Sequence, residues 1–226
     1  MSEPGPDPAP TAARRGGAQR IPRPSSARAG DPAPWAHLDD AARRVDIARL
    51  RDVFATIGPP VASARETEMA RGSAVLAAIY EHDGEAHVVL TRRSAALRAH
   101  GGEVSFPGGR RDDGEELAET ARREAFEETG LDPASVEVIG ELDHLSTVTS
   151  GSFIVPFVGV LPGRPDLVAS PAEVDAVLHV PLAELLDPHV FREERWDLFG
   201  AERSIYFFEL VGDTVWGATA AMLRQL

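Results

Sequence analysis

The sequence contains no cysteine and no lysine. The absence of cysteine excludes thiolate nucleophiles, zinc–thiolate sites and disulfide bonds. All basic side chains other than histidine are therefore arginines, and Asp and Glu outnumber them, so the formal net charge is −13. Because no basic run offsets this charge, a polyanionic nucleic acid is not an expected partner. An anionic small-molecule substrate would need local help from arginine or a metal ion.

The sequence also has no long apolar run. No segment approaches the roughly 20 apolar residues that cross a bilayer, and the N-terminus lacks the apolar core of a signal peptide. We therefore expect a cytoplasmic protein with no membrane partner. Gly-x-Ser-x-Gly, Walker and Gly-x-Gly-x-x-Gly patterns do not occur, which argues against serine hydrolases, P-loop NTPases and dinucleotide folds.

The 226 residues, 43% of them hydrophobic, suffice for one sizeable core. Residues 1–34 are dominated by Pro, Ala, Gly, Ser and Arg, and we expect a disordered tail because they can bury little apolar surface. Residues 35–71 are expected to form a helix, from Asp39 to Ile57, and a linker. Residues 72–226 are expected to form the main domain.

The main domain shows a mixture of strand and helix patterns. Asp83-Gly84 predicts a hairpin turn between the first two strands. Strands are expected at 74–80, 87–93, 136–142, 153–161, 176–180 and 204–210, with helices at 181–186 and 217–226. Periodicity alone therefore indicates an α+β protein and no particular fold.

The stretch 106–131, FPGGRRDDGEELAETARREAFEETGL, reads as a glycine loop that leads into a helix. Gly108 and Gly109 allow a tight turn and a close approach of another group. Asp113 lies three residues before Glu116, a capping-box pattern that predicts a helix start near this point. The few apolar residues beyond it predict that the helix buries only a narrow stripe.

Three glutamates on this helix are spaced to share one face. Glu124, Glu127 and Glu128 stand at i, i+3 and i+4, and such neighbours repel by a few tenths of a kcal/mol per pair. Arg123 can offset part of this repulsion, and a hard divalent cation such as Mg²⁺ or Mn²⁺ could offset the rest. A solvated acidic helix would explain the glutamates alone, but not the glycine loop before them.

The complete spacing of the stretch resembles the Nudix box, the loop–helix motif of Nudix hydrolases, at every fixed position. The matching residues are Gly109, Glu115, Arg123, Glu124, Glu127, Glu128, Gly130 and Leu131. The resemblance implies the Nudix fold, an α/β/α sandwich with a mixed β-sheet between helices. It also implies metal-dependent hydrolysis of a diphosphate.

The resemblance assigns roles to individual residues. It implies that Mg²⁺ or Mn²⁺ is held by Glu124, Glu127 and Glu128 together with the carbonyl of Gly108, and that Arg123 and Glu115 orient the carboxylates. Nudix enzymes differ in where the general base resides. Glu127 is the first candidate here, and Glu173, from a loop after the box, is the second.

A second resemblance lies just before the box. The sequence reproduces the spacing of the signature found in Nudix enzymes that act on coenzyme A, at Leu90-Thr91, Arg93-Ser94, Arg98, Gly102 and residues 106–109, with Val89 where leucine is usual. This resemblance implies cleavage of coenzyme A or its derivatives to 3′,5′-ADP and 4′-phosphopantetheine. Arg93, Arg98 and Gly109 are the candidate substrate-binding residues. The guanidinium forks of the two arginines match phosphate oxygens.

Two alternatives stay open at this point. One is a Nudix hydrolase of another nucleoside diphosphate derivative, such as ADP-ribose or NADH, because the box reports the chemistry and not the leaving group. The other is a Nudix module that senses a nucleotide without cleaving it, although such modules usually have degenerate boxes. The expected partner is a small-molecule substrate, and a homodimer is left open.

Overall fold

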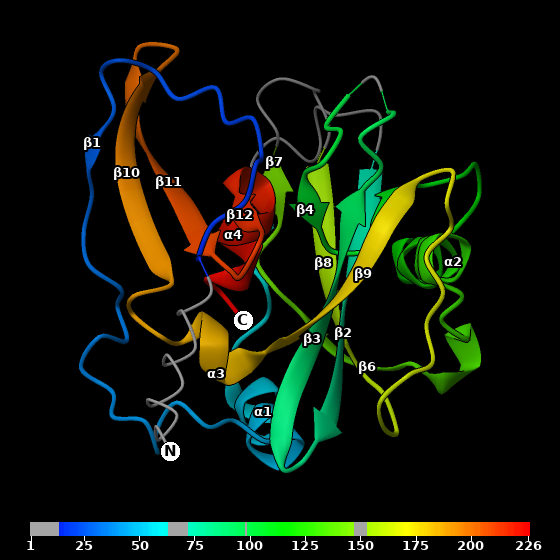
Figure 1. Ribbon diagram of the computed structural model, residues 1–226. Coiled ribbons are helices and arrows are strands. Elements are labelled where there is room, and N and C mark those ends of the chain that lie inside the picture. Colours follow the sequence, from blue (N-terminus) through cyan, green and yellow to red (C-terminus); the bar gives the residue numbers. More distant parts are fainter. Residues whose placement is uncertain (1–13, 63–71, 98, 147–152) are drawn as a thin grey trace, which may run out of the picture.

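The computed structural model of the protein describes residues 14–62, 72–97, 99–146 and 153–226. Two β-sheets form the centre of the molecule (Figure 1). The larger sheet holds β2 (Gly72–His82), β3 (Glu85–Arg93), β4 (Val104–Ser105), β5 (Gly108–Arg110), β6 (Glu137–Glu141), β7 (Leu145–Ser146), β8 (Phe153–Val160) and β9 (Val174–Pro181). The smaller sheet holds β1 (Arg28–Ala29), β10 (Phe191–Leu198), β11 (Ala201–Glu209) and β12 (Thr214–Trp216).

The larger sheet is mixed. Its central pair, β2 and β8, runs parallel, while β3, β5 and β6 join the sheet antiparallel to their neighbours. The hairpin between β2 and β3 turns at Asp83 and Gly84, whose φ angles are 52° and 76°. Positive φ at both turn residues is the pattern of a two-residue hairpin loop. The predicted hairpin is confirmed.

Helices lie against the larger sheet and around its edges (Figure 1). They are α1 (Ile47–Thr56), α2 (Leu117–Thr129), α3 (Leu182–Leu185) and α4 (Gly217–Leu223), with a 3₁₀ turn η1 (Pro133–Ser135) after α2. The α+β class and the mixed sheet between helices are as expected. Of the smaller sheet, only β11 was expected as a strand, at 204–210, and a separate second sheet was not. No helix within the described ranges is long and apolar enough to cross a membrane.

Alternation along β2 gives the sheet two apolar faces, because successive side chains of a strand point to opposite sides. Ala74, Leu76 and Ala78 pack on one face against α2, through Ala121 and Ala125. The other face carries a second cluster that includes Ala77, Ile79, Val88 and Leu90 of the sheet, Phe208 and Val215 of the smaller sheet, and Ala220, Met222 and Leu223 of α4. The sheet is thus covered on both sides, and α2 lies over the first face (Figure 1).

Helix α2 begins three residues later than the sequence predicts. Its N-cap is Glu116, and the capping box joins the Glu116 N–H to the side chain of Glu119 (3.3 Å), so the predicted box at Asp113 is wrong. The side chain of Glu115, just before the helix, accepts instead from the N–H of Asp112. The helix ends at Gly130, whose φ of 71° is the left-handed stop that the sequence predicts.

Two expectations for the N-terminal part differ from the structure. The helix expected from Asp39 begins only at Ile47, because the Asp46 side chain caps it by accepting from the Arg49 N–H (2.7 Å). Residues 14–34, expected as a disordered tail, lie against the smaller sheet and pair with it through β1 and β10. Residues 1–13 and the expected linker at 63–71 lie outside the described residues.

The small residues of α2 set how closely the helix approaches the sheet. Ala121 is fully buried there, whereas Phe126 of the same helix is exposed. Ala121→Leu should therefore destabilise the fold by about 1–3 kcal/mol through overpacking, measured by urea unfolding. Phe126→Ala is the control and should change stability by less than about 0.5 kcal/mol. Equal effects of the two variants would contradict this packing.

Candidate active site

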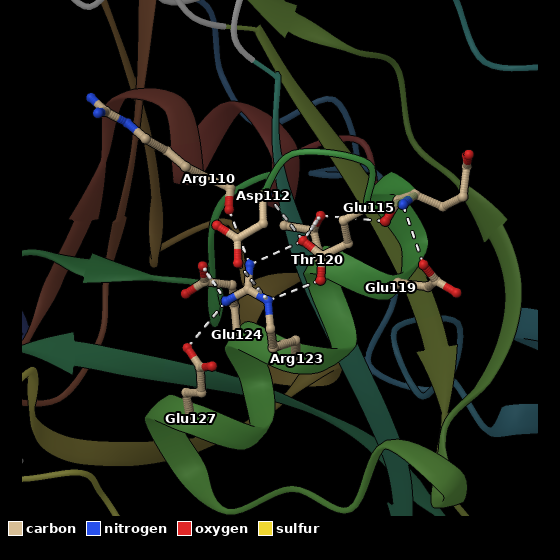
Figure 2. Close-up of polar contacts among 9 residues, drawn as sticks. Arg110, Asp112, Glu115, Glu119, Thr120, Arg123, Glu124 and Glu127 are labelled. Carbon is tan, nitrogen blue, oxygen red and sulfur yellow. Dashed lines mark hydrogen bonds and ion pairs between the residues drawn. The ribbon is translucent and has the colours of Figure 1, made fainter.

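The guanidinium of Arg123, at the middle of α2, organises the acidic residues around it (Figure 2). Its Nε and Nη2 donate to the two carboxylate oxygens of Glu115, at 2.9 and 3.1 Å. Its Nη1 donates to Glu124 (3.0 Å) and Glu127 (3.1 Å), and its Nη2 also donates to the carbonyl of Arg110 (3.1 Å). These five hydrogen bonds match the five N–H groups of a guanidinium. Four of these hydrogen bonds go to carboxylates, and the fifth goes to the backbone.

Glu115 is held from several sides at once. Besides Arg123, it accepts from Thr120 Oγ1 (2.7 Å) and from the backbone N–H of Asp112 (3.2 Å). The hydrogen bonds from Arg123 contribute most to lowering the pKa of Glu115, to about 2. Glu115 is therefore a fixed anion that orients Arg123. Thr120 was missed in the sequence, where a threonine one turn into a helix carries no signal of its own.

Glu128 faces the opposite way, into the protein. Its side chain is only 3% exposed, and Oε2 is buried with no hydrogen-bond partner. The pKa of Glu128 is raised to about 7, mainly by burial and also by the nearby charges of Glu124 and Glu173, while Arg93 and the backbone of Gly108 act in the opposite direction. A buried carboxylate oxygen without a donor is a site at which a cation would be stabilised.

Glu124 lies between these two groups. Arg123 binds one of its oxygens, and burial raises its pKa, with smaller contributions from the charges of Glu127 and Glu173. Gly109 of β5 packs directly against this carboxylate, so that a Cβ added there would lie 2.5 Å from either oxygen of Glu124. Gly109 is therefore needed for the close approach of β5 and α2. This packing does not test the predicted contact of Gly109 with the substrate, which stays a prediction.

The second candidate base also lies near the cluster. Glu173 is exposed at the start of β9, and its carboxylate contributes to the raised pKa of both Glu124 and Glu128. Its backbone carbonyl accepts from the Ser94 N–H (2.8 Å), which ties this loop to the end of β3. The structure thus gathers both candidate bases, Glu127 and Glu173, around the buried glutamates.

The predicted phosphate-binding arginines have different positions. Nη1 of Arg93 lies 3.8 Å from Oε1 of Glu128, so this arginine lies at the site. Arg92 points elsewhere and pairs with the buried Asp213 at 3.1 Å. Arg98 lies outside the described residues.

A pocket of 220 Å³ opens beside the glycine loop. It is lined by Val75, Arg93, His100, Glu103, Val104, Ser105, Phe106, Gly108, Ile154, Ala218, Thr219 and Met222. Most of its lining is apolar, and its charged groups come from the end of β3 and the loop that follows. A larger pocket of 460 Å³ lies beyond the C-terminal end of α2, around Gly130 and Arg164.

The carboxylates fit a divalent cation in their donor chemistry. Oxygen ligands from Glu124, Glu127 and Glu128 are of the type that Mg²⁺ and Mn²⁺ prefer, and Glu128 Oε2 has no other partner. As placed, no three acidic or histidine side chains of the described ranges converge closely enough to enclose an ion. Arg123 binds two of the glutamates, so the binding of a metal ion would require the side chain of Glu127, which is 55% exposed, to turn.

Comparison with known proteins agrees with this site. Residues 70–199 match the model of the NUDIX domain. An uncharacterized Nudix hydrolase, NudL, of Escherichia fergusonii is 41% identical over 167 residues, which cover 72% of this chain and 84% of that protein. Nudix hydrolase 22 of Arabidopsis thaliana, a chloroplastic protein, is 40% identical over 168 residues, 67% of this chain and 52% of its own length.

Among solved structures, a MutT/nudix family protein from Enterococcus faecalis is similar with a TM-score of 0.48 and 14% identity, over 80% of this chain and 68% of that one. The Ap4A hydrolase of C. elegans, solved as a binary complex, gives a TM-score of 0.45 and 18% identity, over 52% of this chain and 84% of that one. The family is carried by the sequence matches, which span more than half of the chain. The chain belongs to the Nudix hydrolases, enzymes that split the phosphorus anhydride bond of nucleoside diphosphate derivatives.

Proposed function

We propose that the protein hydrolyses the diphosphate of coenzyme A or its derivatives, giving 3′,5′-ADP and 4′-phosphopantetheine. One observation carries this proposal. The segment whose spacing resembles the coenzyme A signature, from Leu90 to Gly109, supplies seven of the twelve residues that line the pocket beside Gly108. The same segment delivers Arg93 to the buried carboxylate of Glu128.

The acidic cluster has distinct tasks in this reaction. Glu124, Glu127 and Glu128, with the Gly108 carbonyl, would hold Mg²⁺ or Mn²⁺, which when bound neutralises phosphate charge and acidifies water. Arg123 and Glu115 act through their hydrogen bonds and fix the direction of the carboxylates. These two residues position the site and need not contact the substrate.

Proton transfer is assigned to a glutamate. Glu127 holds Arg123 through Oε2, which leaves Oε1 to take the proton of the attacking water. Glu173 is the second candidate, because it lies near the same carboxylates and is exposed. Arg93, Arg98 and Gly109 are proposed to bind the substrate, with the arginines facing its phosphate groups.

The direct test of the substrate is product analysis. Coenzyme A, ADP-ribose and NADH are incubated separately with Mg²⁺, Mn²⁺ or EDTA, and the products are separated by ion-exchange chromatography. Release of 3′,5′-ADP, fastest from coenzyme A and abolished by EDTA, is the expected result. Faster cleavage of another diphosphate would overturn the coenzyme A assignment but keep the chemistry. No cleavage of any of the three would instead favour a sensing module.

The glutamates can be tested with one matched control. Glu127→Gln and Glu128→Gln should each lower turnover by at least about a hundredfold, because each removes a charged oxygen from the reacting centre. Glu119→Gln makes the same change on the same helix and keeps the capping hydrogen bond, so it should retain full activity. Circular dichroism checks that each variant is folded. Unchanged turnover in both test variants would exclude these roles.

Because Glu128 is buried, we predict that its ionised carboxylate lowers the free energy of unfolding of the metal-free protein. A carboxyl with a folded pKa of about 7 stabilises the fold most below its ordinary value of 4.5, and that contribution is lost as the pH rises to 7 and above. In EDTA at pH 8, Glu128→Gln should therefore be more stable than the wild type, by about 1–3 kcal/mol. The difference should shrink as the pH approaches 4.5. Chemical unfolding across this range measures it, and a less stable variant at pH 8 would contradict the assignment.

A further inference from the structure

The segment 14–23, here called the strap, contacts the start of β12 and the loop that lines the pocket beside Gly108. It passes beside β12 and α4 before the chain turns towards β10 (Figure 1). Gly16 donates its N–H to the carbonyl of Leu210 (2.7 Å), and Gly17 donates to Thr214 Oγ1 (3.0 Å). The strap is thus attached to the start of β12 by its backbone.

One side chain of the strap reaches further. Nε2 of Gln19 donates to Asp213 Oδ1 (2.8 Å) and to the carbonyl of Gly102 (3.1 Å), while its Oε1 accepts from the Thr214 N–H (2.9 Å). Gln19 therefore uses both donors and its acceptor. It connects three segments that are far apart in the sequence.

The contact with Gly102 falls on a loop that is closely tied to β3. Gly102 donates its N–H to the carbonyl of Arg93 (3.0 Å), and the Arg93 N–H donates to the carbonyl of Glu103 (2.9 Å). Asp213 binds Nη1 of Arg92, the preceding residue (3.1 Å). Gln19 and Asp213 thus hold both the loop and the backbone that carries Arg93.

This backbone forms one wall of the pocket beside Gly108. Arg93 and Glu103 line the pocket, with His100 of the same loop, which binds Glu103 at 2.9 Å. The Arg93 side chain extends from this wall to Glu128. A shift of the loop would therefore move a charged wall of the pocket and leave the carboxylates on α2 in place.

We propose that Gln19 is a positioning residue that sets the wall of the substrate pocket. The proposal rests on the proposed function only in taking this pocket as the place of the substrate. Losing the Gln19 contacts lets the loop at Gly102 and Glu103 move, which weakens substrate binding. The chemical step, carried by α2, keeps its rate.

Gln19→Met tests this with a side chain of similar length and no hydrogen-bonding group. Arg15→Met is the matched control, because Arg15 is also a strap side chain but binds Glu184 and Asp187 (both 3.2 Å), remote from the loop. For the diphosphate that the wild type cleaves fastest, Gln19→Met should raise KM by about three- to tenfold, the effect of one hydrogen bond, with kcat within about twofold. Arg15→Met should leave both constants unchanged.

Hydrogen–deuterium exchange gives a second readout that needs no substrate. The N–H of Gly102 donates to the carbonyl of Arg93 in β3, and the N–H of Glu103 donates to the carbonyl of His100. Both N–H groups should exchange faster in Gln19→Met than in the wild type or in Arg15→Met. Gln19→Glu keeps the acceptor for Thr214 but removes both donations, and should show the same change. Unchanged exchange, or equal effects of Gln19→Met and Arg15→Met, would overturn the proposal. Failure of coenzyme A as a substrate would leave this exchange result standing, so the two proposals fail separately.

Discussion

The site depends on how like charges are kept together on one helix. Three glutamates within five positions repel one another, and the structure places them in two different environments. Arg123 binds Glu124 and Glu127, while Glu115 fixes Arg123 from the other side. Glu128 is instead buried, with Arg93 as the nearest cation and one oxygen left without a partner. The negative charge of the cluster is therefore only partly neutralised by the protein itself, which supports the proposal that the cluster binds a cation.

This arrangement requires a close fit between α2 and β5. Small buried residues of the helix allow it to lie near the sheet, and Gly109 leaves room for the carboxylate of Glu124. The rigid sheet thus sets the distance between the glycine loop and the glutamates. Functional groups carried by packed elements hold their geometry better than groups on free loops, and here Glu115 and Glu173 lie just outside such elements.

Local signals explain what the sequence predicted well. The hairpin at Asp83-Gly84 and the helix stop at Gly130 both depend on residues a few positions apart. The predicted start of α2 was wrong because three pairs of acidic residues lie three positions apart there, Asp112/Glu115, Asp113/Glu116 and Glu116/Glu119, and only the structure shows that the last pair forms the cap.

The smaller sheet and the strap could not be predicted, because their stability comes from distant partners. Strand β10 has the sequence FREERWDL, and its many charged residues do not predict a buried strand. Its Arg192 binds Glu209 of β11 (2.7 Å), and Glu194 binds Arg23 of the N-terminal segment (2.7 Å). Gln19 likewise finds its partners more than eighty residues away. No pattern within the segment itself carries this information.

The hydrogen bonds of Arg123 also decide where substrate charge can be met. A guanidinium with all five N–H groups engaged has no donor left for a phosphate oxygen. Arg93 is different, since it makes only a long contact of 3.8 Å with Glu128 and lines the pocket. In a chain with a net charge of −13, a diphosphate needs such a cation close by. Arg123 therefore shapes the site, and the position of Arg93 supports the proposal that this arginine and the loop that the strap holds recognise the phosphates.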